Sequence, residues 1–481
     1  MHSRSTITFN ILTYGALFTT VVLAAASYVA PLAPLTGVLF PAATLLTGTL
    51  LLWRKPGFYI GFMWWTWFLT PEVRRLVDYR SGYNEQSLVM LAPFLVSGIA
   101  LIAVLTKLSS LGPTYRIPFA FTSFGLLYAY IVGVLNNGLI GASFDLLNWG
   151  TPVILGAYLL THKELSKTFQ QATRQAFMWG LLVMGLYGVA QYFYLPPWDA
   201  YWMTQANMVS IGFAEPQQLR VFSTLNSPGP FASVVMAGLL LAFSGGGLIS
   251  GLGSAAGFVG FALSAVRAAW GGWFLGFIVI LSRLPARQRV RLLGMLTVLA
   301  LVGVPLFTLG PVGDLLSQRL ASVTDLENDT SYNERLSLYS DFSSFTSNNP
   351  LGQGLGSTGV ASGIGTQENN MQDLDSGIIA ILYTFGILGT LYFAGGALTL
   401  FMRAILTGSR TQSITEAIYI GITIGTTAQL LFGNAWNGVT GMVLWFFPCL
   451  FLASQRNQPQ VEPELRLQNG PMKGPVRVFK S

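Results

Sequence analysis

Residues 376–402 read SGIIAILYTFGILGTLYFAGGALTLFM, a run without a single charged side chain. A helix that crosses the hydrocarbon core of a bilayer needs roughly 20 mostly apolar residues. Only 9% of the 481 residues are charged and 52% are hydrophobic, whereas about 25% of a typical soluble chain is charged. This composition excludes a disordered chain, a coiled coil and a secreted disulfide scaffold. The single cysteine, Cys449, also excludes a cysteine-based metal site.

Comparable apolar runs recur along the chain and predict an all-α, polytopic integral membrane protein with about 12–14 transmembrane helices. They lie near residues 8–30, 33–53, 57–70, 87–106, 117–136, 140–160, 175–195, 228–243, 248–264, 267–282, 292–310, 376–402, 413–432 and 437–454. With many spans behind it, the first run is expected to be a retained helix rather than a cleaved signal peptide. We expect one membrane domain, 1–454, with loops at about 196–227 and 311–375, and a basic, disordered cytoplasmic tail, 455–481.

The net charge of +7 becomes informative once it is divided between the two sides of the membrane. If the N-terminus is cytoplasmic, the positive-inside rule places 19 basic and 4 acidic residues inside, including all six lysines. The seven remaining cations are arginines, and we expect them to face outward: Arg74, Arg75, Arg80, Arg220, Arg267, Arg319 and Arg335. The basic balance therefore reflects topology, and it does not support nucleic acid as a partner.

Two of the outward arginines stand beside predicted helix starts. Arg220 precedes a helix that is expected to begin near Pro228, with Asn226 or Ser227 as the N-cap. A helix N-terminus and a guanidinium both favour an anion, so a diphosphate subsite is the sharper interpretation and snorkelling to lipid phosphates is the alternative. Arg267 lies between two apolar runs, where an unpaired charge is costly; it predicts either a functional site or a structural arginine bonded to loop carbonyls.

The loop at 311–375 contains nine acidic residues and two arginines. Arg335 is predicted in a short helix along the outer surface, followed by a flexible turn at Gly352, Gly354 and Gly356. That turn is no nucleotide-binding loop, because no strand precedes it and no Lys-Ser/Thr follows. The acids before the next helix are candidate general bases: Asp373 first, then Glu368 and Asp375. Asp375 or Ser376 is alternatively a good N-cap. The acidic cluster matches no known metal-binding spacing, and no metal or other cofactor is predicted.

Four segments, taken in order, resemble the O-antigen ligase and polymerase superfamily of bacterial envelope glycan assembly. RVFSTLNSPGPFA (220–232) is similar to the family's arginine-led segment ahead of a membrane helix, and LSAVRAAWGGW (263–273) to its Ser-Arg motif. ERLSLYSDFSSFTSNNPLGQGLG (334–356) resembles the large periplasmic loop, and DSGIIAILYTFGILGTLYF (375–393) the helix that follows. The specific resemblance covers about residues 180–400.

The resemblance implies a GT-C-like, metal-independent glycosyltransferase of the bacterial inner membrane with both termini cytoplasmic. Its partners would be an undecaprenyl-diphosphate-linked glycan, membrane lipid and, as further candidates, other polysaccharide-assembly proteins. Arg220, Arg267 and Arg335 match the family's arginine positions, which implies diphosphate binding. Ligases that build lipopolysaccharide carry a histidine before the post-loop helix, where this chain has MQDLDSG (371–377). That departure favours a polymerase of O-antigen or exopolysaccharide. The alternatives are a ligase, a transporter or flippase of lipid-linked glycans, and a non-catalytic assembly component.

Overall fold

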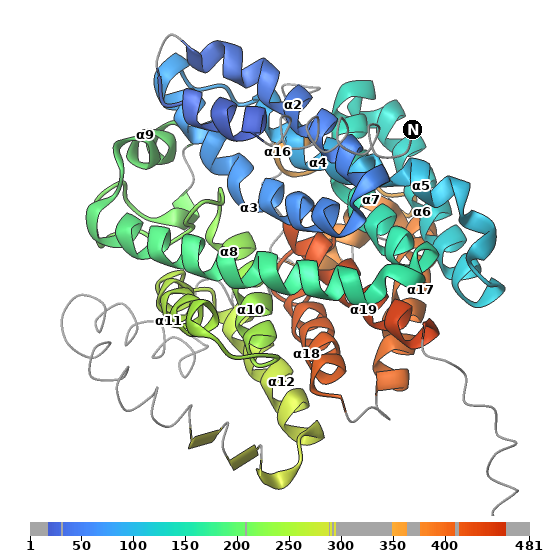
Figure 1. Ribbon diagram of the computed structural model, residues 1–481. Helices are drawn as coiled ribbons and strands as arrows, with labels where there is room; N and C mark the ends of the chain where they lie inside the picture. Colours follow the sequence, from blue (N-terminus) through green and yellow to red (C-terminus); the bar gives the residue numbers. More distant parts are fainter. Residues whose placement is uncertain are drawn as a thin grey trace, which may run out of the picture.

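The computed structural model describes residues 18–29, 32–206, 209–287, 289–290, 293–294, 349–362, 376–408 and 413–457. In these ranges the chain is helical, and the extended backbone contributes one isolated antiparallel bridge, between Gly212 and Leu219. The prediction of an all-α protein is therefore confirmed. The helices pack around each other in one body (Figure 1).

The α-helices of the described residues follow one another in this order: α2 (Ala33–Arg54), α3 (Pro56–Ser81), α4 (Ala92–Gly98), α5 (Ala100–Thr106), α6 (Pro113–Asn137), α7 (Leu139–Thr161), α8 (Ser166–Tyr194), α9 (Pro197–Ala206), α10 (Pro228–Ala242), α11 (Leu248–Leu263), α12 (Arg267–Arg283), α16 (Gly359–Ser362), α17 (Gly377–Gly408), α18 (Ile414–Gln429) and α19 (Gly438–Arg456). Four short 3-10 helices join them: η2 (Leu88–Leu91), η3 (Leu108–Ser110), η4 (Lys163–Leu165) and η5 (Val209–Ile211).

Six helical segments in the described ranges are long and apolar enough to cross a bilayer on their own: Ala33–Arg54, Leu88–Thr106, Pro113–Asn137, Lys163–Tyr194, Gly377–Gly408 and Gly438–Arg456. Two shorter apolar helices, α10 and α11, pack with them. The chain is a multi-pass membrane protein. Most of the predicted span at 292–310, of the predicted loop at 311–375 and of the predicted tail at 455–481 lies outside the described residues.

Two predicted spans differ from what the structure shows. The span expected at 57–70 is the first part of α3, which continues to Ser81 because charged side chains of its last turns are buried in ion pairs rather than solvated. The span expected at 87–106 is divided into η2, α4 and α5. The two runs predicted at 248–264 and 267–282 are confirmed as two helices, α11 and α12, separated by a turn at 264–266.

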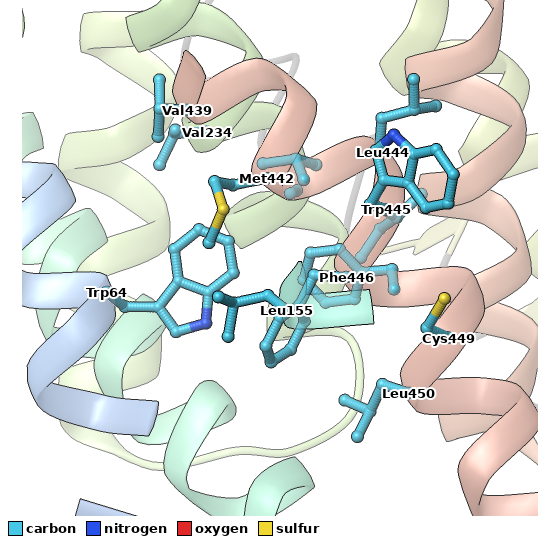
Figure 2. Packing of buried hydrophobic residues seen from close by; sticks show 14 of the residues in the cluster. Trp64, Leu155, Val234, Val439, Met442, Leu444, Trp445, Phe446, Cys449 and Leu450 are labelled. Atoms are coloured by element: carbon cyan, nitrogen blue, oxygen red, sulfur yellow. The ribbon is translucent and has the colours of Figure 1, made fainter. Parts of the chain in front are cut away.

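Helix α19 lies at the centre of the core, in contact with α7, α8, α10, α17 and α18. Figure 2 shows its buried face, including Trp445 and Phe446, against Trp64 of α3 and Leu155 of α7. The Trp64 and Phe446 rings meet edge to face, 5.1 Å apart, an arrangement that suits aromatic quadrupoles. Because lipid tails are as apolar as these side chains, close packing of this kind is what holds membrane helices together.

Basic side chains gather where α5, α7, α12, α17 and α19 end, and we call this the basic end. Arg456 donates to the carbonyl oxygens of Leu160 (3.2 Å) and Ser110 (3.0 Å). Lys107 pairs with Glu164 at 2.6 Å, and Arg283 donates to Gly408 O. The opposite end, where α3 and α8 finish beside α9 and where α10 and α12 begin, is called the α9 end. The described arginines that were expected outward lie at this second end.

Candidate functional site at the α9 end

Arg220 and Arg267 are the two predicted site residues that the structure describes. Glu368, Asp373 and Asp375, the candidate bases, and Arg335, the third candidate diphosphate ligand, lie outside the described residues.

The segment that carries Arg220 is not an open loop. After α9 and η5 the chain forms a small hairpin, in which Gly212, with φ +97°, pairs with Leu219. The hairpin continues into Arg220, whose N–H donates to the carbonyl oxygen of Ile211 at 2.7 Å. The segment predicted as a loop, about 196–227, therefore contains the helix α9 and an ordered hairpin, and the hairpin fixes the backbone of Arg220.

The Arg220 guanidinium is half-buried and lies against the turn between α11 and α12. Its Nε donates to Ser264 O at 3.1 Å, and one Nη donates to Ala265 O at 3.2 Å. The other Nη reaches Ser210 O at 3.2 Å. The backbone reinforces this contact, because Val221 N donates to Leu263 O at 3.1 Å. The planar fork of arginine makes it suitable for bridging several carbonyl oxygens in this way.

The turn that Arg220 holds leads directly into Arg267, the first residue of α12. Ala265 has φ +53°, an unusual conformation for a residue with a side chain, and Val266 is the N-cap of α12. Thus Arg220 bonds to the three-residue turn that leads into Arg267, although the two arginines are 47 positions apart in the sequence. The positive end of the α12 dipole adds to the positive potential there.

Helix α10 begins where the sequence predicts, but the predicted capping hydrogen bond at its N-terminus is not formed. Ser227 is the N-cap and Pro228 the first helical residue, as predicted, but the Ser227 side chain makes no capping hydrogen bond. Pro228 and Pro230 have no N–H, and Phe231 N already donates to Ser227 O at 3.3 Å. The first turn of α10 therefore has few N–H donors for an anion beside Arg220.

A fully buried arginine, Arg75, lies at the same end, and sequence reasoning counted it as outward without assigning it a role. It has no exposed surface. Its Nε lies 2.9 Å from Asp199 of α9, and its other nitrogen atoms donate to Glu72 and to the carbonyl oxygens of Ser223 and Leu225. Burial raises the pKa of the Asp199 carboxyl to about 7, with Arg75 opposing and Glu72 adding to the rise. The sequence signal was the spacing Glu72–Arg75, an i,i+3 pair on one helix face.

The glycine turn after the predicted surface helix is packed rather than flexible. Gly352, Gly354 and Gly356 all have φ between +77° and +84°, a region that glycine enters at little cost. Leu355 N donates to Ala129 O of α6, and Gln353 N donates to Tyr383 O of α17, both at 2.9 Å. The turn is thus wedged between these helices, where non-helical backbone is tolerated because protein surrounds and satisfies it.

Residues 252–394 match the protein-family model described as O-antigen ligase. They form an O-antigen ligase domain. No curated protein matches the chain. The resemblance drawn from the sequence is thereby confirmed over this range, which includes the Arg267 segment, the glycine turn and the beginning of α17. The match over these residues indicates membrane glycan transfer of O-antigen ligase or polymerase type, with lipid-linked glycans as substrates.

The O-antigen ligase domain does not include Arg220, which precedes it in the sequence. The contacts of Arg220 with Ser264 and Ala265 therefore join the N-terminal part of the chain to the domain at the α9 end. Within the domain, Ser376 receives a hydrogen bond from Ile379 N at 3.5 Å, so Ser376 supplies the cap of α17. Ser376 is one of the two N-cap candidates that the sequence offered; the other, Asp375, lies outside the described residues.

Proposed function

We propose that the chain is an inverting, metal-independent glycosyltransferase that polymerises undecaprenyl-diphosphate-linked oligosaccharide at the periplasmic face of the bacterial inner membrane. The observation that supports the proposal is the contact of Arg220 with the 264–266 turn, which leads into Arg267 at the start of α12. Two guanidinium groups and a helix N-terminus provide the charge complement of a diphosphate. The O-antigen ligase domain supplies the class of chemistry.

The proposed reaction is a single displacement. An acceptor hydroxyl oxygen attacks the anomeric carbon, the bond from that carbon to the diphosphate oxygen breaks, and the carrier lipid leaves as its diphosphate. Asp373 takes the hydroxyl proton, with Glu368 or Asp375 as the alternative base. Arg220 and Arg267, together with Arg335, stabilise the negative charge that develops on the leaving group.

The basic end then faces the cytoplasm, together with both termini, and the α9 end faces the periplasm. The concentration of lysine and arginine at the basic end supports this orientation. A fluorescent protein that matures only in the cytoplasm, fused after Ser481, should fluoresce. If that fusion does not fluoresce and a periplasmic reporter fused at the same position is active, the C-terminus is periplasmic and the proposed orientation is wrong.

The decisive experiment combines a deletion strain with complementation. If the protein is a polymerase, the deletion strain accumulates single repeat units on the carrier lipid, and the wild-type gene restores long chains. Arg220→Ala and Arg267→Ala should each reduce polymer by about 100-fold or more, the usual effect of removing a donor that stabilises transition-state charge. Full polymer yield from both variants would sink the assignment of these residues.

The same strain separates the alternatives. Long polymer that accumulates on the carrier lipid indicates a ligase that transfers it to another acceptor. Repeat units trapped on the cytoplasmic leaflet indicate a transporter or flippase. Purified protein that lengthens lipid-linked repeat units in detergent, with a chelator present, would support the enzyme over a non-catalytic assembly component.

A further inference from the structure

The segment between Arg220 and α10 is irregular backbone inside the protein, yet side chains satisfy most of its polar groups. Phe222 N and Ser223 N both donate to Gln191 Oε1 of α8, at 3.1 and 2.8 Å. The hydroxyl of Ser223 donates to Met184 O, and that of Thr224 to Phe68 O, both at 2.6 Å. Ser223 is held at φ +53°. A non-glycine residue in this region persists only where its surroundings fix it.

Arg75 is the charged centre of this arrangement. Its guanidinium fork donates to Ser223 O at 2.6 Å and to Leu225 O, so that one planar group spans two carbonyl oxygens of the segment. Its face lies over the Phe222 ring, with the central carbon 4.9 Å from the ring centroid. Glu72 and Asp199 both pair with the guanidinium.

The two carboxylates are themselves held in place by α8. Gln191 Nε2 donates to Asp199 Oδ2 at 2.6 Å. The hydroxyl of Tyr187 is 2.8 Å from Glu72 Oε1 and 3.0 Å from Asp199 Oδ2, and it accepts from Trp198 Nε1 at 2.7 Å. This buried network of α3, α8 and α9 ends on residues 222–225, immediately after Arg220.

We propose that Arg75 is a positioning residue: with Glu72, Asp199 and Gln191 it fixes residues 221–225 so that Arg220 stays against the 264–266 turn beside Arg267. This inference rests on the proposed function, since the spacing of the two arginines matters only if both engage one diphosphate. Burial of several charged side chains carries a large desolvation penalty, so such a cluster is not needed merely to stabilise a loop. Its contacts are directed at the segment that carries Arg220.

Arg75→Lys is the main test. Lysine keeps the positive charge that Glu72 and Asp199 require, but a single ammonium cannot span Ser223 O and Leu225 O as the fork does. Arg74→Lys is the matched control, because Arg74 is the neighbouring buried arginine and its contacts go to Asp78 and the carbonyl oxygens of Asn84 and Glu85 instead. Gln191→Met is a second variant that removes the bonds to Phe222 N and Ser223 N without altering charge.

Two readouts separate positioning from loss of folded protein. We expect hydrogen–deuterium exchange of peptides covering 219–226 to accelerate in Arg75→Lys and in Gln191→Met, and to remain unchanged in Arg74→Lys. We also expect the Kd of purified protein for undecaprenyl diphosphate in detergent to rise about tenfold, the effect of losing roughly one well-placed charged contact. Partial unfolding would lower the amount of lipid bound but would not change the Kd.

The outcomes distinguish this inference from the proposed function. If Arg220→Ala weakens binding of undecaprenyl diphosphate and abolishes transfer while Arg75→Lys and Gln191→Met match wild type in exchange and Kd, the positioning role is overturned and the proposed function stands. If Arg220→Ala itself leaves the Kd and transfer unchanged, the diphosphate site is elsewhere, whatever Arg75 does. Should Arg75→Lys fail to fold, the exchange and Kd of Gln191→Met decide.

Discussion

A Cβ atom on Gly272 of α12 would stand 2.6 Å from the carbonyl oxygen of Gly425 of α18. One turn further on, Gly276 and Gly421 meet in the same way, with hypothetical Cβ atoms at 2.8 and 2.7 Å from each other's carbonyl oxygens. Each helix thus presents a pair of glycines four residues apart, and the backbones cross without side chains between them. This small-xxx-small contact is a common device for packing membrane helices. Here it fixes the helix that begins with Arg267.

Gly272→Ala should therefore destabilise the protein. The added methyl group would meet the backbone of Gly425 in α18, so the two helices must move apart. Overpacking of this kind costs about 1–3 kcal/mol. Because α12 carries Arg267 at its first residue, we also expect transfer activity to fall. Thermal unfolding in detergent and polymer yield in the complemented deletion strain measure the two effects.

Gly271→Ala is the adjacent control. Nothing lies within 4 Å of a Cβ atom at Gly271, and alanine is favoured over glycine in a helix by up to about 1 kcal/mol. This variant should be as stable as wild type or slightly more so. If Gly272→Ala and Gly271→Ala unfold at the same temperature, the close crossing of α12 and α18 is wrong.

The glycine turn at 352–356 gives a second prediction. Gly354 has φ +80°, and a Cβ atom there would overlap the backbone of Gly133 in α6. Gly354→Ala should suffer both from backbone strain, about 1–2 kcal/mol for a left-handed residue, and from the clash. The turn should then leave its place between α6 and α17, with loss of transfer activity and a lower unfolding temperature.

Gly138→Ala separates the two costs. Gly138 has φ +82°, yet nothing lies within 4 Å of a Cβ atom there. The variant Gly138→Ala should therefore lower the unfolding temperature through backbone strain alone, without a steric clash. Equal destabilisation of the two variants would mean that the turn at Gly354 is not wedged against α6.

The positions of many helices were predictable because hydropathy is a local property of the chain. The start of α10 at Pro228, the separation of α11 from α12 and the end of α19 near residue 454 all agree with the apolar runs. The extension of α3 to Ser81 was not predictable in this way. A hydropathy scan treats Glu72 and Arg75 as the end of a span, whereas partners on α9 and in the 223–225 segment allow them to be buried.

The candidate site also combines features that are local in the sequence with features that depend on contacts between distant residues. Arg220 and Arg267 were predicted as site residues because each is a charge beside an apolar run, a pattern that a single sequence reveals. Their meeting at the 264–266 turn depends on hydrogen bonds between residues more than 40 positions apart, and no local pattern encodes such a contact. No role was predicted for Arg75 for a related reason: its contacts are with Asp199 and Ser223, both distant in sequence. The predicted bases, Asp373 first, stay predictions.

The network around Arg75 also predicts how stability depends on pH. Two carboxylates, Glu72 and Asp199, face one guanidinium, and burial raises the pKa of Asp199 from an ordinary value near 4 to about 7. Between these values the folded protein binds a proton that the unfolded chain does not. The contribution of Asp199 to the free energy of unfolding is therefore full below about pH 4 and is lost as the pH rises toward 7.

Asp199→Asn removes this titration while keeping a side chain of the same size that can still accept from Gln191 and Tyr187. We expect the unfolding temperature of wild type to fall more than that of Asp199→Asn between pH 5 and pH 8. His162 at the basic end contributes with the opposite sign, since burial, with help from Lys107, lowers its pKa, but it is present in both proteins and cancels in the comparison. If the unfolding temperatures of wild type and Asp199→Asn change equally between pH 5 and pH 8, Asp199 is ionised throughout this range, and the buried cluster carries a net negative charge.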